Sequence, residues 1–205
     1  MNSNSKRIAK NTFFLYIRMG MLMLITLYTS RVLLDKIGVQ DFGIYNVIGG
    51  MAGMFTFFSS SLANATQRFL NIELGKGCID NARLIFQQHF TLYLVIILGV
   101  VVVAEPVGLW LIYNKLVIPP DRLVAAIWVF QFTLLSLCFT FVGIVFNSEI
   151  VSHEDMKVYS YIGVIEGLAK LLICYVIAIS DHNRLIFYGV LLMLLTISIQ
   201  MAYAI

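Results

Sequence analysis

Residues 30–77 read SRVLLDKIGVQDFGIYNVIGGMAGMFTFFSSSLANATQRFLNIELGKG, and this stretch decides the fold. It holds the end of one apolar run, a short charged turn, a complete second run and a basic exit segment. Within the second run, small and polar residues recur at steps of three and four, which places them along one face of a helix. This polar stripe, interrupted by one aromatic residue, comprises Asn46, Gly50, Gly53, Phe57, Ser60, Asn64 and Gln67. A lipid-facing stripe would carry large apolar side chains, so we expect this face to meet protein or water.

Composition places the whole chain in the membrane class. Apolar residues make up 60% of the 205 and charged residues 12%, against roughly 45 to 50% and about 25% in ordinary soluble domains. Six apolar runs are each about 20 residues or longer, enough to cross a hydrocarbon core about 30 Å thick. They cover residues 12–34, 42–64, 88–113, 123–147, 158–179 and 185–205. The sequence therefore predicts an all-α, polytopic bundle of six transmembrane helices. The last run stops at Ile205 without a flanking charge, so we expect the chain to belong to something longer.

Basic residues predict the orientation in the membrane. A cytoplasmic amino terminus puts seven of them inside, at positions 6, 7, 10, 68, 76, 83 and 157, and four outside, at positions 36, 115, 122 and 184. Cytoplasmic loops carry the excess of Lys and Arg in membrane proteins, so this orientation is favoured. No basic run is long enough to indicate nucleic-acid binding, and the net charge of +3 is expected to meet anionic lipid.

Apart from Glu105 in the third run, four charged residues lie within or at the edge of apolar runs, where each costs about 2.5 to 3.5 kcal/mol on insertion scales. Arg31, near the end of the first run, can reach the headgroups. Arg18 lies deeper, and about 140° from Arg31 on a straight helix, so both can face one cavity only if this helix bends. Glu166 and Lys170 lie near the middle of the fifth run, in the order that favours an intrahelical pair. They are either functional groups or a self-neutralising structural pair.

Other features allow both a structural and a functional interpretation. The fourth run carries a second polar stripe, formed by Thr133, Ser136, Thr140, Gly143 and Asn147. The two stripes could line one polar cavity, or the hydroxyls could bond their own backbone carbonyls while the stripe only packs. Gly49 and Gly53 form a GxxxG pattern that favours close helix packing. Asp41 is a candidate N-cap for the second helix. Glu105, before Pro106, is either a proton-coupling carboxylate or a solvated one near the headgroups.

Two segments carry a resemblance to a known family. They are LYTSRVLLDKIGVQDFGIYNVIGG, residues 27–50, and SLANATQRFLNIELGKG, residues 61–77. They resemble the amino-terminal signature of bacterial polysaccharide-biosynthesis membrane proteins, the O-antigen and capsule flippases of the multidrug/oligosaccharidyl-lipid/polysaccharide exporter superfamily. The family pattern of Ser-Arg followed by Leu-Gly-x-x-Asp-Tyr-Gly-Ile-Tyr is met with Ile37 and Phe42 as departures. The resemblance implies roughly 12 to 14 helices in two six-helix lobes around a central cavity, of which residues 1–205 would form the first lobe.

The same resemblance implies a function in the bacterial inner membrane. We expect a flippase that moves a polyprenyl-pyrophosphate-linked oligosaccharide by alternating access, with cations meeting the pyrophosphate and polar stripes meeting the sugars. The candidate substrate-binding residues are Arg18, Arg31, Asn46, Asn64, Gln67, Arg68, Glu166 and Lys170. The candidate cavity-lining residues are Ser60, Thr133, Ser136, Thr140 and Asn147. Expected partners are the lipid-linked oligosaccharide, membrane lipid, and a second lobe or a second copy of the chain. Coupling to a proton or a sodium ion is left open.

Two other functions remain as alternatives. One is an ion-coupled antiporter of organic cations, which would need unpaired carboxylates in its cavity. The other is a six-helix membrane scaffold, or fragment, that does not transport. An enzyme is not predicted, since the sequence has no GxxxxGK[ST], HExxH or GxSxG pattern. Cys78, Cys138 and Cys174 form no CxxC, so neither a metal nor another cofactor is expected.

Overall fold

The computed structural model describes the backbone of residues 3–153, 156–179 and 183–204, and their side chains except those of residues 3–11, 156 and 178. The described chain is all-helical, as the sequence predicts. Its elements are α1 (Ser3–Gly75), α2 (Ile79–Asn114), α3 (Leu123–Ser152), α4 (Met156–Ile179) and α5 (Arg184–Tyr203). All five helices are long and apolar enough to cross a membrane, which is consistent with a multi-pass membrane protein. The first two predicted runs both fall within α1.

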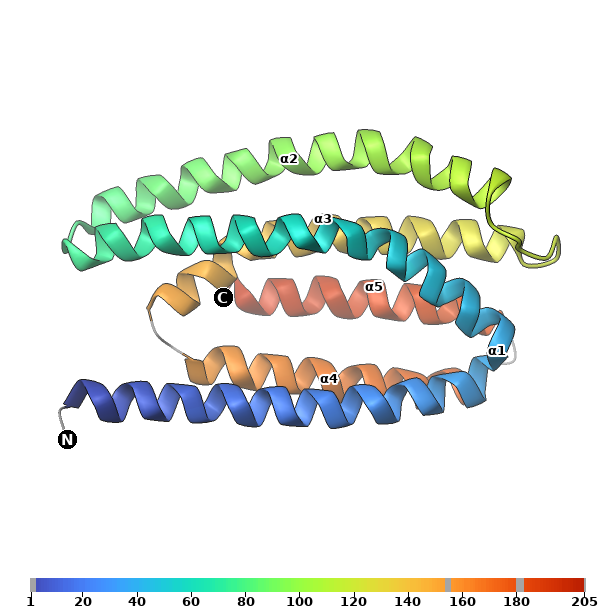
Figure 1. Ribbon diagram of the computed structural model, residues 1–205, viewed down its shortest axis with the longest axis horizontal. Helices are drawn as coiled ribbons and strands as arrows, with labels where there is room; N and C mark the ends of the chain where they lie inside the picture. Colours follow the sequence, from blue (N-terminus) through green and yellow to red (C-terminus); the bar gives the residue numbers. More distant parts are fainter. Residues whose placement is uncertain (1–2, 154–155, 180–182, 205) are drawn as a thin grey trace.

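Gly38 divides α1 into a first arm, residues 3–37, and a second arm, residues 39–75. Its φ of +84° and ψ of 164° are non-helical, and this backbone region is essentially restricted to glycine. Figure 1 shows the two arms running in opposite directions along the bundle. The predicted turn of several residues is thus reduced to one non-helical residue.

Asp41 lies inside the second arm, not at the N-cap position predicted for it. Its side chain is buried, with 5% of the residue exposed, and its Oδ1 is 3.4 Å from Nε of Arg122. Because the helix resumes directly after Gly38, the first turn of the second arm already includes Asp41. The carboxylate therefore joins the bend in α1 to the residue that precedes α3.

The second arm continues without a break through residues 66–75, which belong to the basic exit segment of the sequence. It ends in a Schellman motif, a hydrogen-bonded helix terminus closed by a left-handed residue. The amide of Gly77 donates to the carbonyl of Leu74 at 3.0 Å, and the amide of Cys78 donates to that of Glu73 at 3.1 Å. Gly77 has a φ of +72°, as the motif requires. The chain then turns directly into α2.

The helices form two packed groups that share α5. In the first group, buried side chains of the second arm, α2 and α3 meet at Ile48, Tyr93, Val129 and Phe141. In the second group, the first arm and α4 meet α5, with Leu33, Cys174, Ile177 and Tyr188 buried. Figure 1 shows the first arm beside α4 on one side, α2 on the other, and α5 between. The two arms of α1 thus belong to different groups.

Glycines identify where helices approach closely. A Cβ on Gly108 of α2 would lie 2.5 Å from Cε2 of Phe130, so this glycine makes room for an aromatic ring of α3. By contrast, a Cβ on Gly49 or Gly53 would meet nothing within 4 Å among the described residues. The close packing predicted for this GxxxG pair is therefore wrong within the described chain, because this face of the second arm points away from the other helices.

The bundle has two ends, which are used below to compare depths. Figure 1 places the bend of α1, the α2 to α3 connection and the start of α5 at one end, here called the bend end. The start of α1, the α1 to α2 connection and the end of α3 lie at the other, here called the terminal end. The helices extend from one end of the bundle to the other and are long enough to cross a membrane. We therefore expect each end of the bundle to lie near one membrane surface.

Candidate functional site

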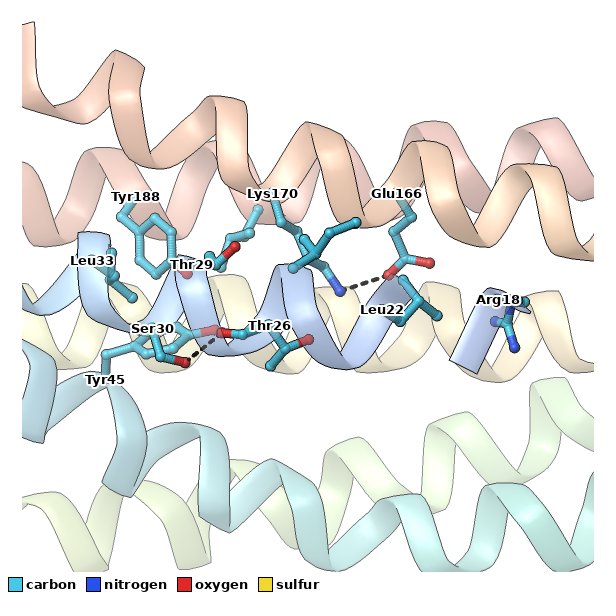
Figure 2. Close-up of a pocket in the computed structure, with 13 residues that line it drawn as sticks. Arg18, Leu22, Thr26, Thr29, Ser30, Leu33, Tyr45, Glu166, Lys170 and Tyr188 are labelled. Atoms are coloured by element: carbon cyan, nitrogen blue, oxygen red, sulfur yellow. Dashed lines mark hydrogen bonds and ion pairs between the residues drawn. The ribbon is translucent and has the colours of Figure 1, made fainter. Parts of the chain in front are cut away.

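A cavity of about 420 Å³ lies within the second group of helices, between the first arm, α4 and α5. Its lining comes mainly from the first arm and α4, with contributions from the second arm and α5. The lining residues are Arg18, Leu22, Ile25, Thr26, Thr29, Ser30, Leu33, Tyr45, Glu166, Gly167, Lys170, Tyr188 and Leu192. Figure 2 shows Arg18 at one end, Glu166 and Lys170 in the middle, and Ser30, Tyr45 and Tyr188 at the other end.

The middle of the cavity holds an ion pair within one turn of α4. Nζ of Lys170 lies 2.6 Å from Oε1 of Glu166, and the two side chains are 45% and 33% exposed, respectively. The favourable order of the two residues along the helix allows this local contact. Since both side chains remain partly exposed to the cavity, the pair can exchange one of its contacts for a ligand.

Arg18 lies at the end of the cavity nearer the terminal end. Its guanidinium carbon is 4.3 Å from the centre of the Tyr159 ring, a cation–π contact that joins the first arm to α4. Its Nε is buried and has no hydrogen-bond partner among the described residues. Nε is the atom of Arg18 nearest to Gly163 of α4, so it faces the backbone of that helix and not the cavity.

Two glycines of α4 hold the first arm in place. A Cβ on Gly163 would lie 2.9 Å from Nη2 and 3.0 Å from Cζ of Arg18, so the guanidinium lies directly against the helix backbone. A Cβ on Gly167 would lie 2.8 Å from Cδ2 of Leu22. Gly163 and Gly167 form a GxxxG pattern that was not predicted to be a packing site, although its spacing of four residues is visible in the sequence.

The opposite end of the cavity is rich in hydroxyl groups. The rings of Tyr45 and Tyr188 meet edge to face with centroids 4.9 Å apart. Ser30 donates its hydroxyl to the carbonyl of Thr26 at 2.9 Å, while Oγ1 of Thr29 is buried without a partner among the described residues. The cavity therefore has Arg18 at one end, the Glu166–Lys170 pair in the middle and several hydroxyl groups at the other end.

Of the predicted substrate-binding residues, Arg18, Glu166 and Lys170 are brought together by the cavity. The others on α1 do not line it, and Arg31, Asn46, Asn64 and Arg68 are exposed while Gln67 is partly buried. Arg31 is separated from Arg18 because the first arm has no break between them, as the angle expected for a straight helix requires.

In the polar stripe of the second arm, Asn46 and Ser60 donate hydrogen bonds to backbone carbonyls of their own helix. Asn46 donates to the carbonyl of Phe42 at 2.8 Å, and Ser60 donates to that of Phe57 at 2.9 Å. Both residues are exposed. This face of the second arm has no partner helix among the described residues at its glycines, and it remains a polar surface within a predicted membrane span.

The second polar stripe packs inside the bundle. Its hydroxyls donate to carbonyls four residues earlier in α3, from Thr133 to Val129, Ser136 to Phe132 and Thr140 to Ser136. Gly143 makes room for the side chain of Gln200 in α5. Oδ1 of Asn147 is buried without a partner among the described residues. The two stripes are not brought together around the cavity between the first arm and α4.

A separate polar cluster joins the second arm to α2. Nδ1 of His89 lies 2.9 Å from Oγ1 of Thr66, and Tyr93 donates its hydroxyl to the carbonyl of Leu62 at 2.8 Å. Thr66 and Tyr93 also hydrogen-bond to each other. This cluster was not predicted, because its members are far apart along the chain. Among the described residues, no group of three or more His, Cys, Asp or Glu side chains is placed to hold a metal ion.

No protein-family model, curated protein or solved structure matches the chain.

Proposed function

We propose that the chain is a transport lobe that moves a polyprenyl-diphosphate-linked oligosaccharide across the bacterial inner membrane by alternating access. The single observation that carries the proposal is the cavity between the first arm, α4 and α5. It combines two cations, one carboxylate and several hydroxyls among helices that are apolar enough to cross a membrane. A substrate with an anionic diphosphate, a sugar and an apolar tail matches that combination of groups.

We further propose that the chain crosses the membrane six times, with its amino terminus in the cytoplasm. Each arm of α1 contains one of the six predicted apolar runs, and the arms run in opposite directions. Six crossings place the terminal end of the bundle on the cytoplasmic side, where the sequence puts seven basic residues against four outside. Arg18 then lies on the cytoplasmic side of Lys170, in the order a headgroup would meet them.

The chemistry of the charged groups supports binding of a diphosphate. Attraction between opposite charges is several times stronger in a low-dielectric cavity than in water, and hydrogen bonds from cations to phosphate oxygens are strong. Arg18 contributes its guanidinium to one end of the cavity. Glu166 holds the ammonium of Lys170 at 2.6 Å while the site is empty. A diphosphate could then take over Lys170 while remaining near Arg18.

The first arm supports a path for the apolar tail. Met19, Met23 and Leu24 are each more than 60% exposed, and the arm packs mainly on one side, against α4 and α5. A polyprenyl chain could lie along this apolar surface within the bilayer while the headgroup occupies the cavity. Such a division keeps the tail in hydrocarbon and the charge in a polar site, which avoids the cost of unpaired charge in lipid.

We propose that a second six-helix unit, in a continuation of the chain or in a second copy, covers the exposed stripe of the second arm. Asn46, Ser60 and Asn64 are exposed on this face, and polar groups in contact with hydrocarbon are costly. Donor and acceptor dyes on purified chains in one detergent micelle or nanodisc would test self-association. Energy transfer that appears when each micelle or nanodisc holds two chains supports a second copy. Its absence favours a continuation of the chain.

The proposed function is tested by binding of three ligands with the same prenyl chain: a diphosphate, a monophosphate and an alcohol. We expect the purified chain in detergent to bind them in that order of decreasing affinity. Arg18→Ala should weaken diphosphate binding by roughly tenfold, the value of one charged hydrogen bond of about 1.5 kcal/mol. Arg31→Ala is the matched control, since Arg31 lies on the same arm, exposed and outside the cavity. Equal binding of the three ligands, or equal effects of both substitutions, would overturn the proposal.

The two alternatives make different predictions in the same assay. An organic-cation antiporter would need a free carboxylate in the cavity, but Glu166 is paired with Lys170. A scaffold would bind none of the three ligands at the cavity. Tight binding of a lipophilic cation that Glu166→Gln abolishes would support the antiporter instead.

A further inference from the structure

A second amphipathic groove lies on the other side of the bundle, between α2, α3 and α5. It has a volume of about 420 Å³ and is lined at one end by Glu105, Trp128, Gln131 and Phe132. Its remaining lining is almost wholly apolar and includes Leu135 and Met193. This groove has no residue in common with the cavity proposed to hold the transport substrate.

In this groove Glu105 has a neutral hydrogen-bond partner, Gln131. Nε2 of Gln131 donates to its Oε1 at 2.6 Å, which fixes the carboxylate between α2 and α3. None of the ion pairs formed among the described residues involves Glu105. A partly buried carboxylate with a neutral protein partner favours a cation from outside the protein, because charged groups at such depth are normally paired.

Two aromatic rings lie next to this carboxylate. Trp128 and Phe132 stack with ring centroids 5.7 Å apart and an interplanar angle of 26°, and 51% of Trp128 is exposed. The faces of aromatic rings attract ammonium groups, and tryptophan does so most strongly. The head of the groove thus combines a carboxylate with an exposed aromatic surface, the two features that recognise an ammonium ion.

The groove lies at the depth where lipid headgroups meet acyl chains. With 36 residues, α2 is about 54 Å long, so a core about 30 Å thick centred on it begins about 12 Å from either end. Glu105 is nine residues from the last residue of α2, or about 14 Å from the bend end. Trp128, five residues into α3, also lies near this boundary, where tryptophan is enriched in membrane proteins. From there the apolar part of the groove continues toward the hydrocarbon core.

We propose that Glu105, Gln131 and the Trp128–Phe132 pair form a binding site for a phosphatidylethanolamine-type lipid. Its primary ammonium lies against the Glu105 carboxylate and the aromatic rings, and one acyl chain lies along the apolar part of the groove. An anionic lipid is disfavoured because it brings a negative charge to Glu105 and no ammonium. The proposal does not depend on the transport function, because the groove and the cavity are lined by different residues.

Trp128 itself can report on the occupant. The chain has two tryptophans, so Trp110→Phe leaves Trp128 as the single fluorophore. This variant is reconstituted in vesicles of phosphatidylethanolamine and phosphatidylglycerol with identical acyl chains. In one preparation only the ethanolamine lipid carries bromines near the headgroup end of its chains, and in the other only the glycerol lipid carries them. The lipid composition is then the same and only the position of the quencher differs.

We expect brominated phosphatidylethanolamine to quench Trp128 about threefold more strongly than brominated phosphatidylglycerol, from one ammonium contact at a partly exposed site. Glu105→Gln keeps the shape of the side chain and should remove the preference. Glu149→Gln, the same change at the far end of α3, should retain it. Equal quenching by both lipids in the Trp110→Phe protein overturns the proposal without reference to any other variant. A preference that survives Glu105→Gln overturns the role of the carboxylate.

Discussion

Gly163→Ala adds one methyl group at the point where Arg18 touches α4. The new carbon would overlap Nε of Arg18 and would lie 2.9 Å from Nη2 and 3.0 Å from Cζ, whereas ordinary contacts begin near 3.4 Å. The guanidinium must therefore move by roughly 1 Å, since atoms cannot overlap within their van der Waals radii. Because Arg18 is flexible, we expect the side chain to leave its place over Tyr159 while α4 stays intact.

The effects on stability and on ligand binding should differ in size. Alanine is favoured over glycine in a helix by up to about 1 kcal/mol, and loss of the cation–π contact costs about the same. These contributions oppose each other, so the thermal midpoint should change little. Binding of a polyprenyl diphosphate should weaken roughly threefold to tenfold, which corresponds to the loss of about 1 kcal/mol.

The assay compares Gly163→Ala with Gly53→Ala in purified protein, by ligand titration and by thermal unfolding. Gly53 is also helical, but a Cβ there meets nothing within 4 Å, so Gly53→Ala should bind the diphosphate like the original chain. If Gly163→Ala binds the diphosphate as tightly as Gly53→Ala does, the position of Arg18 against α4 does not matter for the ligand. The reasoning about the cationic end of the cavity would then be refuted.

Three further predictions concern the bend end and the topology. In a background without native cysteines, a reagent that cannot cross membranes should label a cysteine at Asn114 but not at Asn81, and the reverse result would contradict the proposed orientation. Gly38→Ala should lower stability by about 1 to 3 kcal/mol from backbone strain alone, since its φ is +84° and its surroundings are open. A thermal midpoint that does not fall would refute this. Burial raises the pKa of Asp41, and the nearby Arg122 partly offsets that shift. The contribution of Asp41 to stability is thus full below about pH 4, near the unfolded pKa, and is lost as pH rises through the folded pKa. Arg122→Gln should enlarge the loss between pH 4 and pH 7, and an unchanged pH dependence would argue against the pair.

Local spacing was enough to predict those features of the chain that depend on one helix. The apolar runs indicate the helices because a membrane crossing needs about 20 apolar residues whatever surrounds it. The four-residue step from Glu166 to Lys170 predicts their contact, found at 2.6 Å, because residues so spaced share a helix face. The merging of the first two runs into α1 was not predicted, because the chain reverses its direction at the single non-helical residue Gly38 and not over a turn of several residues.

Contacts between helices could not be predicted in the same way. A polar stripe defines a face of a helix but not the neighbour of that face, so the shared cavity of the two stripes was only one of two interpretations. The meeting of Arg18 with Tyr159, and of Glu105 with Gln131, depends on how each helix is rotated in the bundle. Both glycine pairs show the same GxxxG spacing. Gly163 and Gly167 pack against the first arm, whereas Gly49 and Gly53 have no neighbouring helix within 4 Å among the described residues. A spacing alone does not distinguish these cases.

The central claim is that the cations of the cavity hold a diphosphate, and exchanging Glu166 and Lys170 tests it most directly. The double variant Glu166→Lys, Lys170→Glu keeps the net charge and the intrahelical pair but moves the ammonium by about 6 Å along α4. Titration of the purified variant with a polyprenyl diphosphate should show at least about tenfold weaker binding than the original chain, the loss expected for one charged hydrogen bond. Binding equal to that of the original chain would show that the two residues form only a structural pair and that the headgroup is held elsewhere.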